Sequence, residues 1–379
     1  MEPQITKNTF CTYTGAQSES DTTVFFVSGN PGLIGYYHPF LSLLAQNLVD
    51  ESQPQIETKN TTKKTSFQIY GCSLGGFEIP PVAKHESVQN AKEGHNKNHL
   101  YDLEGQIRFV HRKLVDLMHG NKRISADDAG EPKLGSDPST PAPKQKVILI
   151  GHSVGAYIAM EILRRHREGI PNIEALSSTG SATGHADSSS SSSFDIIGGV
   201  MLFPTVKDIA HSPSGQKLTT LLSFLPHLAL IVSFFARILT SVLPSSTLKS
   251  VVRSVMKDPP AHGLETTLAF LKSSGGVRQA LHMAAHEMRT ITSDKWTDDV
   301  WGVGCGPEPT TRLFFYFGKN DHWVAEKTRD EVIALRGREE GLGPKMFVCE
   351  EGLPHAFCLK HSDIMARKVA NMIQGIVQD

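Results

Sequence analysis

The sequence predicts an α/β protein whose mostly parallel sheet is covered by helices on both faces. Short apolar runs bounded by Gly or Pro recur along its 379 residues, and amphipathic segments lie between them. Alternation of strands and helices is typical of a parallel sheet buried on both sides. Because 39% of the residues are apolar and 20% are charged, a large core is possible. We interpret residues 1–379 as a single domain that carries insertions.

The apolar runs are rich in β-branched and aromatic residues, which favour buried strands. The predicted strands are Thr22–Ser28, Phe67–Gly71, Lys146–Ile150, Asp195–Phe203, Arg312–Phe317 and Lys345–Cys349. Helices are predicted where apolar residues recur three or four positions apart. The predicted helices are Leu103–Met118, Ala156–Arg167 and Val324–Arg336.

Two segments interrupt this alternation. Residues 121–145 are rich in Pro, Gly, Ser and charge, and residues 176–193 include six consecutive serines. Their apolar content is too low to fold independently. We predict that both are flexible surface insertions.

Charge and cysteine content exclude several classes of function. The net charge of −1, from 38 basic and 39 acidic residues, argues against a nucleic-acid partner. Five cysteines without a C-x-x-C pair argue against a disulfide framework or a zinc site, and we expect no metal and no cofactor. The first twenty residues lack the apolar run of a signal peptide, so we expect a cytosol-facing protein.

The pattern G-x-S-x-G occurs twice, around Ser73 and around Ser153. A nucleophile elbow needs a strand before the serine and a helix after it. Ser153 has both, whereas two prolines at 80 and 81 prevent a helix directly after Ser73. We therefore predict Ser153 as the nucleophile and Ser73 as a loop residue at the same end of the sheet.

The other members of a catalytic triad should follow in the order acid, then histidine. Asp321 lies just after the Arg312–Phe317 strand, and His355 follows the last predicted strand. In open α/β sheets, ligands bind outside the carboxyl ends of the strands, where both side chains would lie. The competing histidines are His322 and His361. The weaker candidates for the acid are Asp298, Asp299 and Asp330.

This order of residues predicts acyl transfer. His355 takes the proton of Ser153 as the hydroxyl attacks a carbonyl, and Asp321 holds the tautomer of the imidazole. One oxyanion-hole donor is the N–H of Val154, directly after the nucleophile. The glycine-rich loop SGNPGLIG after the first predicted strand supplies the second donor, Asn30; the alternative is an ordinary Gly-Pro turn.

The segment 217–244 contains nineteen consecutive uncharged residues, Leu218–Ala236. As one helix they would span about 28 Å, close to a hydrocarbon core of roughly 30 Å. A single crossing would put the strands before Ser153 and Asp321 on opposite sides of a membrane, so we exclude it. We predict a helix–Pro–helix hairpin, broken at Pro226, that dips into a lipid monolayer; the alternative is a lid packed on the sheet. The segment belongs to an inserted helical lid at residues 205–290.

The chain resembles the lipid droplet-associated serine hydrolases, a branch of the α/β-hydrolase superfamily. The resemblance rests on Gly29-Asn30-Pro31-Gly32 with Tyr36-Tyr37 and Phe40, on GHSVGAY at 151–157, on 318–323, and on His355-Ala356-Phe357. It implies an α/β-hydrolase fold, a location on lipid droplets and the endoplasmic reticulum, and hydrolysis of sterol esters or acylglycerols. A lipid transacylase, or a largely non-catalytic protein of the droplet surface that acts in lipid storage, remain alternatives.

Overall fold

The structure is a computed structural model of the whole chain. It describes residues 2–15, 22–50, 65–79, 99–128, 144–170, 194–225, 227–304, 311–337 and 343–378. These residues form one eight-stranded sheet with the strand order β1-β2-β4-β3-β5-β6-β7-β8. The strands are β1 (Gln4–Ile5), β2 (Thr9–Tyr13), β3 (Thr22–Val27), β4 (Phe67–Cys72), β5 (Gln145–His152), β6 (Phe194–Leu202), β7 (Arg312–Phe317) and β8 (Lys345–Val348).

All six predicted strands are present as β3 to β8, and they pair in parallel. The predicted α/β class with a mostly parallel sheet is confirmed. β5, β6 and β7 are hydrogen-bonded neighbours, so the strands that carry Ser153 and Asp321 share one sheet. The antiparallel edge strands β1 and β2 were not predicted, because both are short and carry polar residues.

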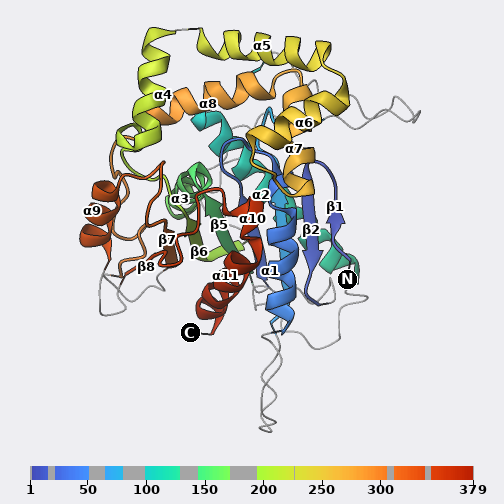
Figure 1. Cartoon of the computed structure of the whole chain (residues 1–379). Helices are drawn as coiled ribbons and strands as arrows, with labels where there is room; N and C mark the ends of the chain where they lie inside the picture. Colours follow the sequence, from blue (N-terminus) through green and yellow to red (C-terminus); the bar gives the residue numbers. More distant parts are fainter. Residues whose placement is uncertain are drawn as a thin grey trace, which may run out of the picture.

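Helices cover both faces of the sheet (Figure 1). α1 (His38–Asp50) and α11 (Ser362–Val377) pack against one face. α2 (Leu103–Asp128), α3 (Val154–Arg167) and α9 (Glu326–Arg336) pack against the other. The short helices η2 (Ile34–Tyr36) and α10 (Phe357–Lys360) lie in the loops after β3 and β8.

Of the two predicted insertions, the first is shorter than expected. α2 continues to Asp128 and thus includes residues 121–128, which contain neither Pro nor Gly to end the helix. Residues 129–143, and the whole predicted insertion 176–193, lie outside the described residues.

A group of helices between β6 and β7, which we name the helical insert, gathers at one end of the molecule above the sheet (Figure 1). It follows η3 (Ile209–His211) and comprises α4 (Pro213–Phe224), α5 (Leu228–Val242), α6 (Ser245–Val255), α7 (Ala261–Lys272) and α8 (Gly276–Thr290). Within the described part of the chain, no single helix has the length and hydropathy of a membrane span. α4 and α5 together reach that composition, but they meet at 94°, which is a right-angle bend rather than the predicted hairpin.

Candidate active site

Ser153 lies in the turn that joins β5 to α3. Its φ of 56° and ψ of −125° are strained for a residue with a side chain, as expected of a nucleophile elbow. The backbone N–H of Ser153 donates to the carbonyl of Leu202 at 2.9 Å, which fixes the turn against β6. A Cβ on Gly155 would lie 2.3 Å from the carbonyl oxygen of Val27, so α3 approaches β3 this closely only because Gly occupies the position.

Asp321 and His355 form a hydrogen-bonded pair on the loops after β7 and β8. The imidazole Nδ1 lies 2.8 Å and 2.9 Å from the two carboxylate oxygens. The carboxylate is buried, and one of its oxygens also accepts the N–H of Trp323. Because the carboxylate binds Nδ1, the Nε2 of His355 is left to exchange a proton with another group.

The competing candidates lie elsewhere. His322 is exposed, and His361 lies at the start of α11. Asp298, Asp299 and Asp330 are exposed, and each pairs with an arginine.

The loop after β8, which carries His355, contacts the elbow through His152, the residue before Ser153. Its ring lies 5.0 Å from that of His355, and its Nε2 lies 2.9 Å from the His355 carbonyl oxygen. Among the described contacts, Ser153 and His355 share no direct hydrogen bond. Such bonds are often long before substrate binds. Ser73, in contrast, is buried in the loop after β4, where its hydroxyl accepts the N–H of Ile34.

The loop after β3 runs beside the elbow. A Cβ on Gly29 would lie 3.0 Å from the Cβ of Ser153, so this loop touches the candidate nucleophile. The next residue, Asn30, has a partly buried side chain whose amide donates to the carbonyl of Ala280 and to a carboxylate oxygen of Glu287, both at 2.9 Å. Val154 is the first residue of α3, so its N–H has no acceptor within the helix.

Glu287 is a buried neighbour of the candidate site that was not predicted from the sequence. It lies on α8, and its side chain is buried beside Asn30. Burial raises the pKa of Glu287 to about 7, although the hydrogen bond from Asn30 acts in the opposite direction. Glu287 follows Met283 by four residues, and Met283 follows Gln279 by four. Residues at this spacing share one face of a helix. Since Met283 and Gln279 are buried, the spacing would have placed Glu287 on the inner face.

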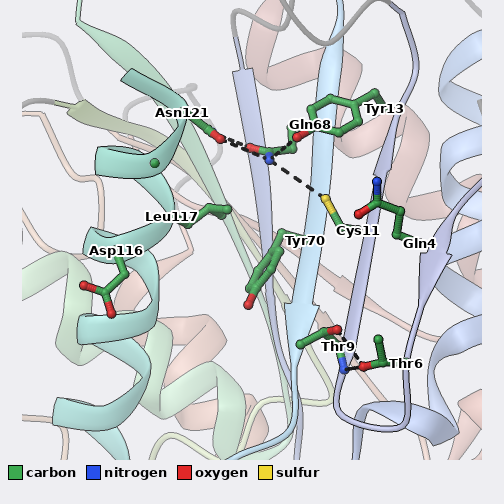
Figure 2. A pocket seen from close by; sticks show the side chains of 11 residues that line it. Gln4, Thr6, Thr9, Cys11, Tyr13, Gln68, Tyr70, Asp116, Leu117 and Asn121 are labelled. Atoms are coloured by element: carbon green, nitrogen blue, oxygen red, sulfur yellow. Dashed lines mark hydrogen bonds between the residues drawn. The ribbon is translucent and has the colours of Figure 1, made fainter. Parts of the chain in front are cut away.

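A separate hollow of about 390 Å³ lies between the edge strands and α2. Figure 2 shows its polar lining, where the side chain of Gln68 bonds with Tyr13 and Asn121 and reaches toward Cys11. None of the residues around Ser153 line it. Within the described ranges, no group of three or more His, Cys, Asp or Glu side chains could hold a metal ion.

Comparison with known sequences identifies the family. A sequence profile described as "Lipid-droplet associated hydrolase" matches residues 20–358. The chain belongs to the lipid droplet-associated hydrolase family. Its relatives include the lipid droplet-associated hydrolases of Mus musculus, 25% identical over 94% of this chain and 86% of the relative, and of Gallus gallus, 26% identical over 92% and 83%. The resemblance predicted from the sequence motifs is thereby confirmed.

Solved structures show the fold of this family member. The peroxisomal α/β-hydrolase of Saccharomyces cerevisiae superimposes with a TM-score of 0.50, covering all of this chain and 87% of that protein at 12% identity. The predicted α/β-hydrolase fold is therefore confirmed. Family and fold together make the protein a hydrolase.

Proposed function

We propose that this hydrolase cleaves carboxylic esters of lipids at the surface of lipid droplets, with Ser153, His355 and Asp321 as its triad. The observation that carries the proposal is the hydrogen-bonded Asp321–His355 pair at the carboxyl ends of the parallel strands. Its carboxylate is buried, and its imidazole contacts His152, the residue before the strained Ser153. The family name, which places relatives on lipid droplets, supports the location.

In the proposed mechanism, the Nδ1–H of His355 donates to Asp321, which leaves the lone pair of Nε2 free. His355 then accepts the proton of Ser153 as the hydroxyl attacks the ester carbonyl. The backbone N–H groups of Val154 and Asn30 donate to the oxyanion, and the positive end of α3 favours its charge. The alcohol leaves with the proton of His355, and water attacks the acyl-enzyme in a second, equivalent step.

The helical insert supplies the proposed contact with the lipid surface. α5 turns small residues toward the protein and large apolar residues toward solvent, which reverses the usual pattern of a surface helix. Ala229, Ser233, Ala236 and Thr240 are its half-buried residues, and they repeat at the helical spacing. On the outer side, Phe235 is 62% exposed.

The exposed face continues onto α4 and α6. Of the 18 large apolar side chains that are exposed in the described residues, 13 lie between Leu221 and Val255. An apolar patch of this kind marks an interaction surface. Removing these side chains from water would contribute on the order of 10 kcal/mol to the free energy of docking, before the cost of ordering is subtracted. This figure uses ~1.5–3 kcal/mol for each fully exposed residue. We propose that residues 217–244, together with α6, dock on the monolayer of a droplet or on the cytosolic leaflet of the endoplasmic reticulum.

Covalent labelling with a fluorophosphonate probe tests the proposed nucleophile. Wild-type protein should be labelled and should release fatty acid from an emulsion of cholesteryl oleate or triolein, and Ser153→Ala should do neither. Ser73→Ala is the matched control: it should still be labelled, with a lower melting temperature because the N–H of Ile34 loses its acceptor.

Labelling of Ser153→Ala, or loss of labelling in folded Ser73→Ala, would contradict the proposed elbow. Adding a sterol or a monoacylglycerol as acceptor distinguishes hydrolysis from acyl transfer, because a transacylase would form a new ester in place of free fatty acid. If folded wild-type protein is not labelled at all, the proposal of an active serine hydrolase fails.

A further inference from the structure

A chain of hydrogen bonds through two buried side chains joins three loops around the proposed nucleophile. The imidazole of His152 lies 2.9 Å from the carbonyl oxygen of His355 on one side and 2.8 Å from the hydroxyl of Tyr37 on the other. The same hydroxyl accepts the backbone N–H of Gly29 at 3.3 Å. His152 and Tyr37 are both 4% exposed, so water does not compete for the two bonds of the Tyr37 hydroxyl.

The chemistry of the partners fixes the direction of every bond in this chain. A carbonyl oxygen can only accept, so the Nε2 of His152 carries a hydrogen and donates to His355. Burial lowers the pKa of His152 well below its usual value, so the ring is neutral and its Nδ1 is an acceptor. The hydroxyl of Tyr37 therefore donates to Nδ1, while its oxygen accepts from Gly29. Burial also raises the pKa of Tyr37, which keeps the hydroxyl protonated.

This chain of hydrogen bonds touches three parts of the proposed site. His152 directly precedes Ser153, the carbonyl belongs to the base His355, and Gly29 directly precedes Asn30. The imidazole of His152 therefore connects the elbow, the loop that carries His355 and the loop that carries Gly29 and Asn30.

Aromatic rings enclose this imidazole. The ring of Phe357 lies perpendicular to it at 5.1 Å, and that of Phe203 lies at 6.1 Å. Because these rings exclude water, a donor or acceptor that lost its partner here would stay unsatisfied. Breaking one bond of the chain would therefore cause the loops that it joins to shift.

We propose that His152 and Tyr37 are positioning residues, which hold the base and the oxyanion donor at their working distance from Ser153 through this directed chain. The inference rests on the proposed triad and adds two residues that do not touch substrate. Displacement of a catalytic group by about 1 Å can cost about 100-fold in rate. Loss of the chain should therefore lower kcat while leaving the affinity for substrate nearly unchanged.

Steady-state hydrolysis of a short soluble ester tests the proposal, because such a substrate does not need the lipid surface. Tyr37→Phe removes only the hydroxyl and should lower kcat about 10- to 100-fold, with KM within about twofold of wild type. Tyr36→Phe is the matched control, because its hydroxyl bonds to Thr267 of the helical insert instead. This variant should keep the wild-type kcat.

A pair of substitutions at His152 separates hydrogen bonding from packing. His152→Leu removes both bonds and should lower kcat as Tyr37→Phe does. His152→Gln carries an amide that can donate to the carbonyl of His355, and it should retain at least about 10 times the kcat of the leucine variant. The melting temperature of each variant is measured alongside, and Tyr37→Phe, which loses a single oxygen atom, decides the matter if a His152 variant does not fold.

Wild-type kcat in Tyr37→Phe would overturn the proposal whatever the His152 variants show, as would equal loss in His152→Gln and His152→Leu. These failures are distinct from failure of the triad. If Ser153→Ala keeps its activity, the proposed nucleophile is wrong, whereas activity that depends on Ser153 but not on Tyr37 or His152 refutes only the positioning role.

Discussion

Replacing Glu287 with Gln should make the protein more stable, and the gain should grow with pH. The pKa of Glu287 is raised from an ordinary value of 4.5 to about 7 by burial. Between these two values the folded chain holds a proton that the unfolded chain has released, so stability falls as pH rises from about 4.5 to about 7. Glutamine has nearly the same shape, keeps an oxygen that accepts from Asn30, and does not titrate.

The size of the effect follows from the difference between the two pKa values. At about 1.4 kcal/mol per pH unit, the full difference corresponds to about 3 kcal/mol. Between pH 5 and pH 8, the free energy of unfolding of Glu287→Gln should rise relative to that of wild type by about 2.5 kcal/mol. This is less than the full difference because part of the titration of the unfolded chain lies below pH 5.

Urea unfolding followed by tryptophan fluorescence measures this difference at each pH. Comparing variant with wild type removes the contribution of every other titrating group. Glu265→Gln on α7 is the control, because that side chain is exposed; its effect should stay within about 0.5 kcal/mol at both pH values. A difference between Glu287→Gln and wild type that does not change with pH would refute the reasoning, since it would mean that the buried carboxyl titrates as in water.

Three further predictions concern catalysis and docking. Asp321→Asn should lower kcat by about 10³- to 10⁴-fold without changing the melting temperature, because the tautomer of the base is lost while the geometry is kept; unchanged turnover would assign the role to another carboxylate. Phe234→Asp combined with Phe235→Asp should weaken flotation with droplets more than about 100-fold, at roughly 2.5–3.5 kcal/mol for each charge at hydrocarbon depth. Both side chains are at least 60% exposed, so an unfolded double variant would show that this face packs against protein. Residues 217–258 hold five basic side chains and one acidic side chain, Asp258, which pairs with Arg253. Lys249→Glu with Arg253→Glu should therefore reduce binding to vesicles containing phosphatidylserine by at least about 1 kcal/mol for each site. Vesicles of phosphatidylcholine alone should bind both proteins equally, and equal loss on both kinds of vesicle would exclude an electrostatic contribution.

The central sheet could be predicted because its strands are nearly continuous apolar runs, a signal that needs no knowledge of distant contacts. The elbow at Ser153 was equally local, since strand, Gly, Ser, Gly and helix follow one another directly. Asp321 and His355 could be assigned because both follow parallel strands, whose carboxyl ends meet at one edge of the sheet. The structure brings these two side chains together as expected, and their catalytic role stays a prediction.

The helical insert shows where local signals become ambiguous. The sequence indicated an apolar helix–Pro–helix segment, which is compatible both with a buried lid and with a docking surface. Only the packing of α5 on α8 decided which side of the helix meets the protein, and that side carries alanine, serine and threonine. The bend of 94° was also not predictable, because it depends on what α4 and α5 each contact.

The sequence alone thus determined the fold, the position of the candidate elbow and the order of the candidate triad, because each of these depends on neighbouring residues or on the polarity of parallel strands. Tertiary structure alone decided that Glu287 meets Asn30 and that His152 joins Tyr37 to the carbonyl of His355. The partners in these bonds lie more than 100 residues apart in the sequence. No periodicity or motif predicts contacts between residues so far apart. The physical reason is that a buried polar group must find a partner wherever the fold places one, and that position is set by the packing of the whole domain.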